Sequence, residues 1–220
     1  MISTKIFEPE ILNTIQNNLL NLLNSCPDMD NAHIVNSPRA VGDTVQEILG
    51  DKMIECFPKG LIKNFNDSFA RRSMADVAFM DYEDNYFVVD IKTHNRNTDF
   101  NMPNLTSVER LSRLYEDDKN YFVILLAEYK VINGKIVFDM VRLVPIEHLI
   151  WNCLTIGALG WGQVQIANAR IVNIDRNQTR KEWMLKLCDV MDIFYPKEIS
   201  KIEKRVTYFE KVRKFWENKQ

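Results

Sequence analysis

The sequence predicts an α/β (α+β) fold in which a mixed central β-sheet is flanked by helices. Apolar residues recur with helical spacing near both ends of the chain, and short runs rich in aromatic and β-branched residues occupy its middle. Strands that are separated by a helical stretch are typical of a sheet with a helical crossover connection. At 220 residues, the chain is long enough to bury a core without covalent crosslinks, so we expect a single domain.

Two helices are predicted before the first strand. Apolar residues between Ile11 and Leu23 recur at steps of three and four residues, and the residues from Cys26 to Asp28 end that stripe. A second helix follows Ser37 and Pro38. Its apolar residues share an inner face, and Asp43 and Glu47 lie one turn apart on it.

Four strands are predicted in the middle of the chain, over residues 74–80, 86–92, 121–129 and 135–143. A polar turn joins the first two as a hairpin, and Asn133-Gly134 joins the last two. The third strand is nearly continuously apolar, as expected of a sheet centre that is covered on both faces. Between the second and third strands, we expect a polar stretch from His94 to Asn101 and a helix from Asn104 to Tyr115.

The C-terminal third combines a glycine-rich loop with helical segments. Three glycines predict a tight or mobile loop over residues 155–162, and a strand-like run follows from Gln163 to Ile174. A capping-box pattern at Thr179 predicts a helix start, and helical spacing recurs between Ile199 and Val212 among lysines and arginines.

Composition excludes several classes of protein. The net charge of −2 argues against a uniformly basic nucleic-acid binder, but from Arg170 onward 13 Lys and Arg face 8 Asp and Glu, a balance of +5 that leaves −7 elsewhere. The four cysteines are widely spaced, which predicts buried free thiols rather than a zinc site or disulfides. Without a signal-like N-terminus or a long apolar segment, we expect a cytoplasmic protein.

Three charged residues on the first hairpin carry the strongest chemical signal. Asp76 lies in one strand, and Asp90 and Lys92 lie in the next. Alternation places Asp90 and Lys92 on one face, beside the acid of the partner strand. Paired carboxylates suit a hard divalent cation such as Mg²⁺, and a neighbouring lysine suits phosphodiester hydrolysis. The alternative is an ordinary ion pair, because short Asp-x-Lys patterns are common.

This acid followed by Asp-x-Lys resembles the motif of the PD-(D/E)xK nucleases, with Ala75 where the motif has proline. The similarity is greatest to the EcoRV-like and HincII-like type II restriction endonucleases. It spans roughly residues 40 to 190 and includes the segments 89–93, 103–104 and 177–183. The resemblance implies the restriction-endonuclease-like fold.

The same resemblance implies a homodimer that cuts a short palindromic site in double-stranded DNA with Mg²⁺. The products would carry 5′-phosphate and 3′-hydroxyl ends, blunt ends are expected from the most similar members of the family, and the host would contain a companion DNA methyltransferase. Asp76 and Asp90 would hold the metal with the Ile91 carbonyl, and Lys92 would contact the scissile phosphate or the attacking water. Glu47 would be a further catalytic acid, although Asp43 and Gln46 compete for that place and a solvated helix face is the alternative.

DNA contacts are assigned by residue type alone. Polar residues after the catalytic strand and beyond the glycine-rich loop suit phosphate and base-edge contacts, namely Thr93, His94, Asn95, Arg96, Asn97, Asn104, Gln163, Gln165, Asn168 and Arg170. The alternative for the first of these groups is a plain polar loop.

On this interpretation, the single nuclease domain has four parts. They are an N-terminal helical segment (1–36), a catalytic core (37–150), a DNA-recognition region (151–190) and a basic C-terminal helix (191–220). The basic helix could track a DNA backbone, cover a subunit interface or be solvated. Two further functions stay open: a repair or junction-resolving nuclease of the same family, and a non-catalytic DNA-binding α/β domain.

Overall fold

A computed structural model describes residues 4–30, 32–66, 76–98 and 101–219. The chain divides into two compact units, one ending at Thr179 and one beginning at Arg180. The first unit is a mixed α and β structure whose central sheet contains both parallel and antiparallel strands. Among the described residues, no helix is long and apolar enough to cross a membrane.

In the first unit, three α-helices precede the strands, and a fourth lies between β4 and β5. The α-helices are α1 (Pro9–Ser25), α2 (Ala32–Val35), α3 (Pro38–Lys52) and α5 (Val108–Leu114). The strands are β1 (Ile62–Asn66), β2 (Val77–Asp81), β3 (Tyr86–Asn95), β4 (Asn104–Ser107), β5 (Asn120–Ile132), β6 (Lys135–Pro145), β7 (Leu154–Gly157) and β8 (Gln163–Ile166). Short 3₁₀ helices cover Lys5–Phe7, Pro27–Asp30, Met53–Cys56, Ile146–His148 and Trp151–Cys153.

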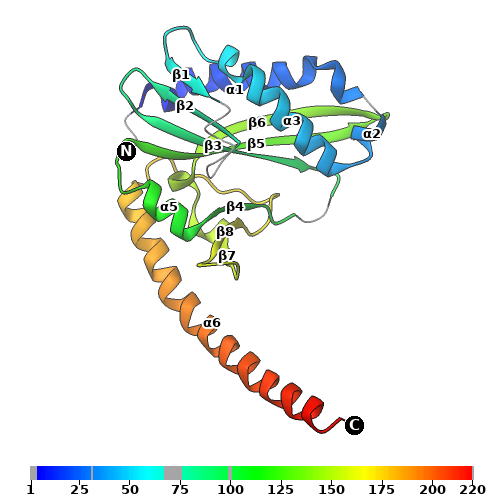
Figure 1. Ribbon diagram of the computed structural model, residues 1–220. Coiled ribbons are helices and arrows are strands. Elements are labelled where there is room, and N and C mark those ends of the chain that lie inside the picture. Colours follow the sequence, from blue (N-terminus) through cyan, green and yellow to red (C-terminus); the bar gives the residue numbers. More distant parts are fainter. Residues whose placement is uncertain (1–3, 31, 67–75, 99–100, 220) are drawn as a thin grey trace. The chain divides into compact units, whose positions relative to one another are not determined.

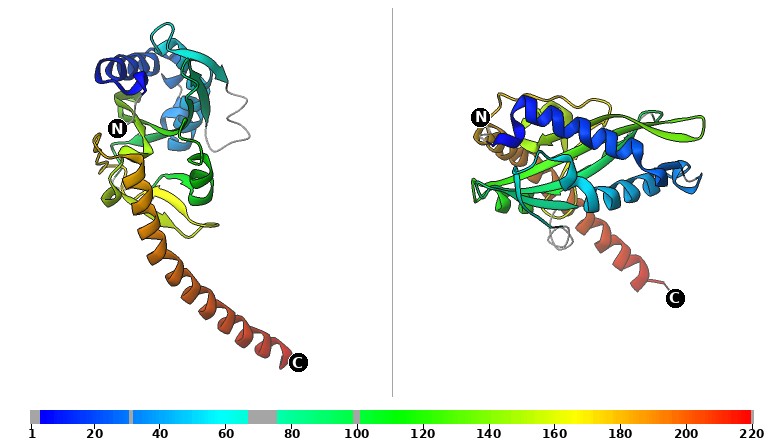
Figure 2. Two further views of the ribbon diagram at one scale, coloured as in Figure 1. Left: turned by 90° about the vertical axis from the view of Figure 1, so that its left-hand side faces the viewer. Right: turned by 90° about the horizontal axis from the view of Figure 1, so that it is seen from above.

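The strands form two sheets. The larger has the order β1-β2-β3-β5-β6, and only its β3–β5 pairing is parallel. The smaller has the order β4-β8-β7 and is antiparallel. Figure 1 shows α1 and α3 on one face of the larger sheet and α5 with the smaller sheet on the other, and Figure 2 gives two further views of these layers.

The core lies between α1, α3 and one face of the larger sheet. Odd-numbered residues of β3, such as Phe87, Val89 and Ile91, are buried there with the inner faces of both helices. Even-numbered residues of β3 therefore face the opposite layer, because side chains alternate along a strand. This alternation decides which face carries Asp90 and Lys92.

The sequence predicted both N-terminal helices and the strands around the first hairpin. Ser37 caps α3, its side chain accepting a hydrogen bond from the Ala40 N–H. Asn133 and Gly134 both have positive φ, as the predicted two-residue hairpin between β5 and β6 requires. Central strand β5 is buried on both faces from Tyr121 to Tyr129, as its apolar run indicated. The predicted strand residues Met74 and Ala75 lie outside the described residues.

Several predicted boundaries are wrong. The helix expected from Asn104 begins at Val108, because β4 pairs with β8 first and Ser107 caps α5 through the Arg110 N–H. Only Gln163–Ile166 of the strand-like run 163–174 is a strand. Strand β1 was not predicted because its sequence is short and polar.

The expected glycine-rich loop is also partly wrong, because its first residues form β7. A Cβ added at Gly157 would lie 2.8 Å from side-chain atoms of Gln165. This glycine therefore leaves room for the Gln165 side chain of the neighbouring strand instead of making a turn.

The second unit contains one helix, α6 (Arg180–Glu217). The predicted start near Thr179 is confirmed, but the boundary drawn at residue 190 falls inside this continuous helix.

No disulfide joins the four cysteines. Cys56 and Cys153 are buried as expected, whereas Cys26 is half-buried and Cys188 is exposed on α6, so those two expectations are wrong.

Candidate active site

Asp76 is fastened to strand β3 by two hydrogen bonds. The residue immediately precedes β2, and its N–H donates to the Val89 carbonyl over 3.0 Å. Its carboxylate Oδ2 accepts a hydrogen bond from the Ile91 N–H at 2.7 Å. Because these two partners flank Asp90 in the sequence, the backbone brings the two predicted carboxylates together.

Asp90 and Lys92 form an ion pair on one face of β3. Lys92 Nζ donates to Asp90 Oδ1 over 2.8 Å, and only 7% of the Asp90 side chain is exposed. The second oxygen, Oδ2, is buried and has no hydrogen-bond partner among the described residues. Buried polar atoms are nearly always paired, so this oxygen could accept a hydrogen bond or contact a cation.

Burial raises the pKa of Asp90 to about 7. The Lys92 ammonium lowers that pKa, but incompletely, and the Asp76 carboxylate raises it further. Burial also raises the pKa of Asp76, against the opposing effects of the Ile91 N–H, the Lys92 charge and a hydrogen bond from Gln46. The two acids therefore carry unfavourable buried charge, which a bound cation would relieve.

Helix α3 contributes Gln46 to this cluster. Its side chain hydrogen-bonds the Asp76 carboxylate. Successive helix residues point about 100° apart, so Glu47 turns away and is exposed. Asp43 is also exposed and lies 3.9 Å from Arg39. Of the three residues that competed for the upstream position, the structure brings only Gln46 to Asp76, so the choice of Glu47 lacks geometric support.

The donor set fits a hard cation with few protein ligands. Among the described residues, no group of three or more His, Cys, Asp and Glu side chains could hold a metal ion. Two carboxylates remain, with the Ile91 carbonyl beside Asp90 in the same strand. Mg²⁺ is commonly held by one or two carboxylates while it keeps several waters, so the open oxygen of Asp90 is compatible with it.

The expected polar loop after Lys92 begins later than predicted, because β3 continues to Asn95. Thr93 faces α3, where a Cβ on Gly42 would lie 3.5 Å from its hydroxyl oxygen. His94 is only 5% exposed, and burial lowers its pKa. Neither ring nitrogen of His94 has a hydrogen-bond partner within the described part of the chain. The strand thus buries this imidazole instead of presenting it on a loop for phosphate contact.

The polar residues that follow β3 are engaged in local structure. Asn95 accepts a hydrogen bond from the Asn97 N–H, and Asn97 accepts one from the Val131 N–H. Arg96 is exposed and pairs with Asp139 at 2.9 Å. These bonds fix the turn that carries the Arg96 side chain, which stays at the surface.

The smaller sheet joins two of the other predicted DNA contacts. Asn104 on β4 and Gln165 on β8 are paired in the strand register, and the Gln165 amide donates to the Asn104 side-chain oxygen. Gln163 lies two residues earlier in β8 and is half-buried. The sheet therefore brings the Asn104 side chain beside two amide side chains that lie about 60 residues later in the sequence.

Arg170 is exposed and bridges back to the turn after β3. Its guanidinium donates to the Thr98 carbonyl at 2.9 Å and to the Arg96 carbonyl at 3.3 Å. Asn168 supports the segment by accepting a hydrogen bond from the Arg170 N–H. Two exposed arginines thus lie together, although 74 residues separate them in the sequence.

Sequence reasoning missed the group of charges beside His94. Glu128 is opposite His94 in the parallel register of β3 and β5. It is buried, forms an ion pair with Arg142 and lies 3.7 Å from Arg96. An acid within the otherwise apolar run of β5 was the signal that could have indicated it.

No protein-family model matches the chain, and no curated protein matches it.

Proposed function

We propose that this protein is a Mg²⁺-dependent endonuclease that hydrolyses phosphodiester bonds in double-stranded DNA. The observation that carries the proposal is the cluster of Asp76, Asp90 and Lys92 with one buried carboxylate oxygen left open. In more specific terms, we propose a type II restriction endonuclease of the PD-(D/E)xK family that recognises a short palindromic site. The resemblance of the motif and its position on an antiparallel hairpin support this assignment.

The sheet also supports the family assignment. The two motif strands, β2 and β3, are neighbours, and β3 pairs in parallel with β5. This arrangement places the Asp-x-Lys strand inside the sheet and not at its edge. A functional cluster on a central strand is held rigidly, as catalytic geometry requires.

Asp76, Asp90 and the Ile91 carbonyl would hold the metal ion. When bound, Mg²⁺ would neutralise phosphate charge and activate water for attack on phosphorus. Asp76 keeps its orientation through the Ile91 N–H, and Gln46 steadies it from α3. Lys92 would donate a hydrogen bond to a phosphate oxygen or orient the attacking water, because its ammonium lies at the same carboxylate.

The alternative of a purely structural ion pair explains less of the geometry. A structural pair is expected to satisfy both carboxylate oxygens, because an unpaired buried acceptor is destabilising. Asp90 instead has an open oxygen, a raised pKa and a second acid nearby. Perturbed acids grouped in this way are typical of functional sites.

Digestion of bacteriophage DNA, followed by sequencing of the fragment ends, tests the proposal directly. We expect cleavage only with Mg²⁺, at one short sequence, with 5′-phosphate and 3′-hydroxyl ends. Asp90→Asn protein, purified in the same way, is the matched control and should leave the DNA intact. Cleavage confined to branched or otherwise structured DNA would favour a repair nuclease instead. Binding without any cleavage would favour the non-catalytic reading.

A further inference from the structure

The C-terminal half of α6 carries an apolar seam. Five large apolar residues on it are each between 53% and 66% exposed, namely Ile199, Ile202, Val206, Phe209 and Trp216. With Arg213, they follow one another at alternating steps of three and four residues. This spacing is the heptad pattern of a coiled coil, in which a and d positions line one side of the helix.

The heptad register assigns each residue a position. Ile199, Val206 and Arg213 are at a, and Ile202, Phe209 and Trp216 are at d. β-branched residues at a favour two-stranded parallel coiled coils, and a single polar residue at a specifies register and orientation. The seam begins after Pro196, which lies inside α6 and cannot donate a backbone hydrogen bond.

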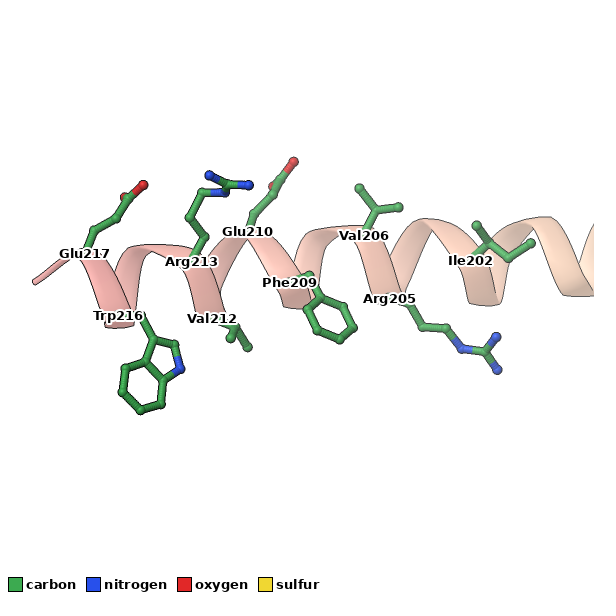
Figure 3. Close-up of a pocket in the computed structure, with 9 residues that line it drawn as sticks. All are labelled: Ile202, Arg205, Val206, Phe209, Glu210, Val212, Arg213, Trp216 and Glu217. Carbon is green, nitrogen blue, oxygen red and sulfur yellow. The ribbon is translucent and has the colours of Figure 1, made fainter. Parts of the chain in front are cut away.

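The flanking charges select the partner. Figure 3 shows the a and e residues Val206, Glu210, Arg213 and Glu217 on one side of the helix, and the d and g residues Arg205, Phe209, Val212 and Trp216 on the other. Arg205 is a g residue and Glu210 is the e residue five positions later. In a parallel pair of identical helices, Arg205 of each copy meets Glu210 of the other, which gives two symmetric attractive pairs. One heptad earlier, Glu198 would meet Glu203, but Glu198 already pairs with Lys201 of its own helix at 2.6 Å, which offsets that repulsion.

An antiparallel pair would bring the e positions together instead. Those positions are Glu203, Glu210 and Glu217, so acids would face acids and repel. In the parallel arrangement, Arg213 meets Arg213 of the second copy. Glu210, three residues earlier, and Glu217, four residues later, lie beside Arg213 on the same helix and offset that repulsion.

We propose that residues 199–217 of α6 form a parallel, in-register coiled coil with α6 of a second copy of this chain. The seam is self-complementary in shape, because each exposed apolar residue meets its equivalent. It is also self-complementary in charge through Arg205 and Glu210. The helix gains the packed apolar face that isolated helices in water lack.

Sedimentation of the full chain tests whether the seam associates. Val206→Glu places a charge in the seam, whereas Thr207→Glu adds the same charge to the outer face. We expect Val206→Glu to weaken dimerisation at least about 100-fold and Thr207→Glu to leave it within about threefold. Arg205→Glu should weaken dimerisation, and the double variant with Glu210→Arg should restore it.

Disulfide crosslinking tests the orientation independently of other contacts between copies. In a background with Cys188→Ser, the variants Ile202→Cys and Trp216→Cys should each form a covalent dimer under mild oxidation, while Thr207→Cys should not. In an antiparallel pair, a positions face d positions, so crosslinking of Ile202→Cys to Arg213→Cys only in mixtures would overturn the parallel orientation.

Two results would overturn the pairing itself. One is the absence of both self-crosslinks together with identical sedimentation of Val206→Glu and the unaltered chain. The other is a monomeric chain that binds phosphatidylserine vesicles through the seam, with Val206→Glu abolishing that binding. None of these measurements involves DNA cleavage, so they are independent of the nuclease proposal.

Discussion

Lys92 donates from its ammonium to one oxygen of Asp90 over 2.8 Å, while the other oxygen of that carboxylate is buried and has no hydrogen-bond partner among the described residues. A carboxylate with a lysine on one oxygen and no partner on the other is suited to bind a cation close to a phosphate group. The same arrangement makes the metal-free protein less stable than it could be, because a buried charge is only half satisfied.

Asp90→Asn should therefore stabilise the metal-free protein while abolishing cleavage. The pKa of Asp90 is raised from 3.8 to about 7, so the folded protein favours the protonated carboxyl group. The stability that this group contributes is therefore complete below pH 3.8 and is lost as pH rises through 7. We expect a gain of roughly 2 kcal/mol at pH 8 and almost none at pH 4, measured by urea unfolding. A loss of stability at pH 8 would support the structural ion pair instead.

Lys92→Ala should reduce DNA cleavage by at least about 100-fold, because an ammonium positioned at developing phosphate charge is a large catalytic contribution. Lys63→Ala is the control, since Lys63 pairs with Asp84 at the surface on β1. The circular dichroism of both variants should match that of the unaltered chain. Wild-type cleavage by Lys92→Ala would remove this residue from the mechanism.

Gln46→Ala and Glu47→Ala form a matched pair of substitutions on α3. Loss of Gln46 removes a hydrogen bond that holds Asp76 and lowers its pKa, so cleavage at pH 7 should fall about tenfold. Removal of the exposed Glu47 carboxylate should change the rate less than twofold. The reverse order of effects in single-turnover assays would reinstate Glu47 as the upstream acid.

Arg170→Ala should weaken DNA binding about tenfold at low salt. The slope of the logarithm of the binding constant against the logarithm of salt concentration should also become less steep by about one. The binding measurement uses the Asp90→Asn background, so that DNA is not cut. Arg110→Ala, an exposed arginine on α5, is the control. Equal salt slopes in all three proteins would mean that Arg170 contacts no phosphate and only holds the turn after β3.

His148 should make the protein sensitive to acid. Burial, with the charge of Arg176, lowers its pKa from 6.5 to about 4, against the opposing effect of Asp175. Its contribution is therefore present above pH 6.5 and is lost as pH falls toward 4. When the pH falls from 7.5 to 5, the free energy of unfolding should decrease by about 1 kcal/mol less for His148→Gln than for the unaltered chain. The difference is this small because solvent screens part of the effect. The same decrease of the free energy of unfolding in both proteins would exclude a contribution of His148.

The sequence alone predicted the features that depend on local periodicity. Helix α3, the hairpin that carries Asp76 and Asp90, and the turn at Asn133 were all readable, because a few adjacent residues determine each of them. Strand alternation was enough to place Asp90 and Lys92 on one face.

Tertiary structure alone decided features that depend on contacts between distant segments. The choice of Gln46 over Glu47 required the rotation of α3 against Asp76, and the pairing of Asn104 with Gln165 required the register of β4 and β8. Strand β4 replaced part of a predicted helix because a distant strand supplied its hydrogen bonds. The burial of His94 likewise depends on the layer that covers β3. Spacing in the sequence records which side chains share a face, but packing determines what lies opposite that face.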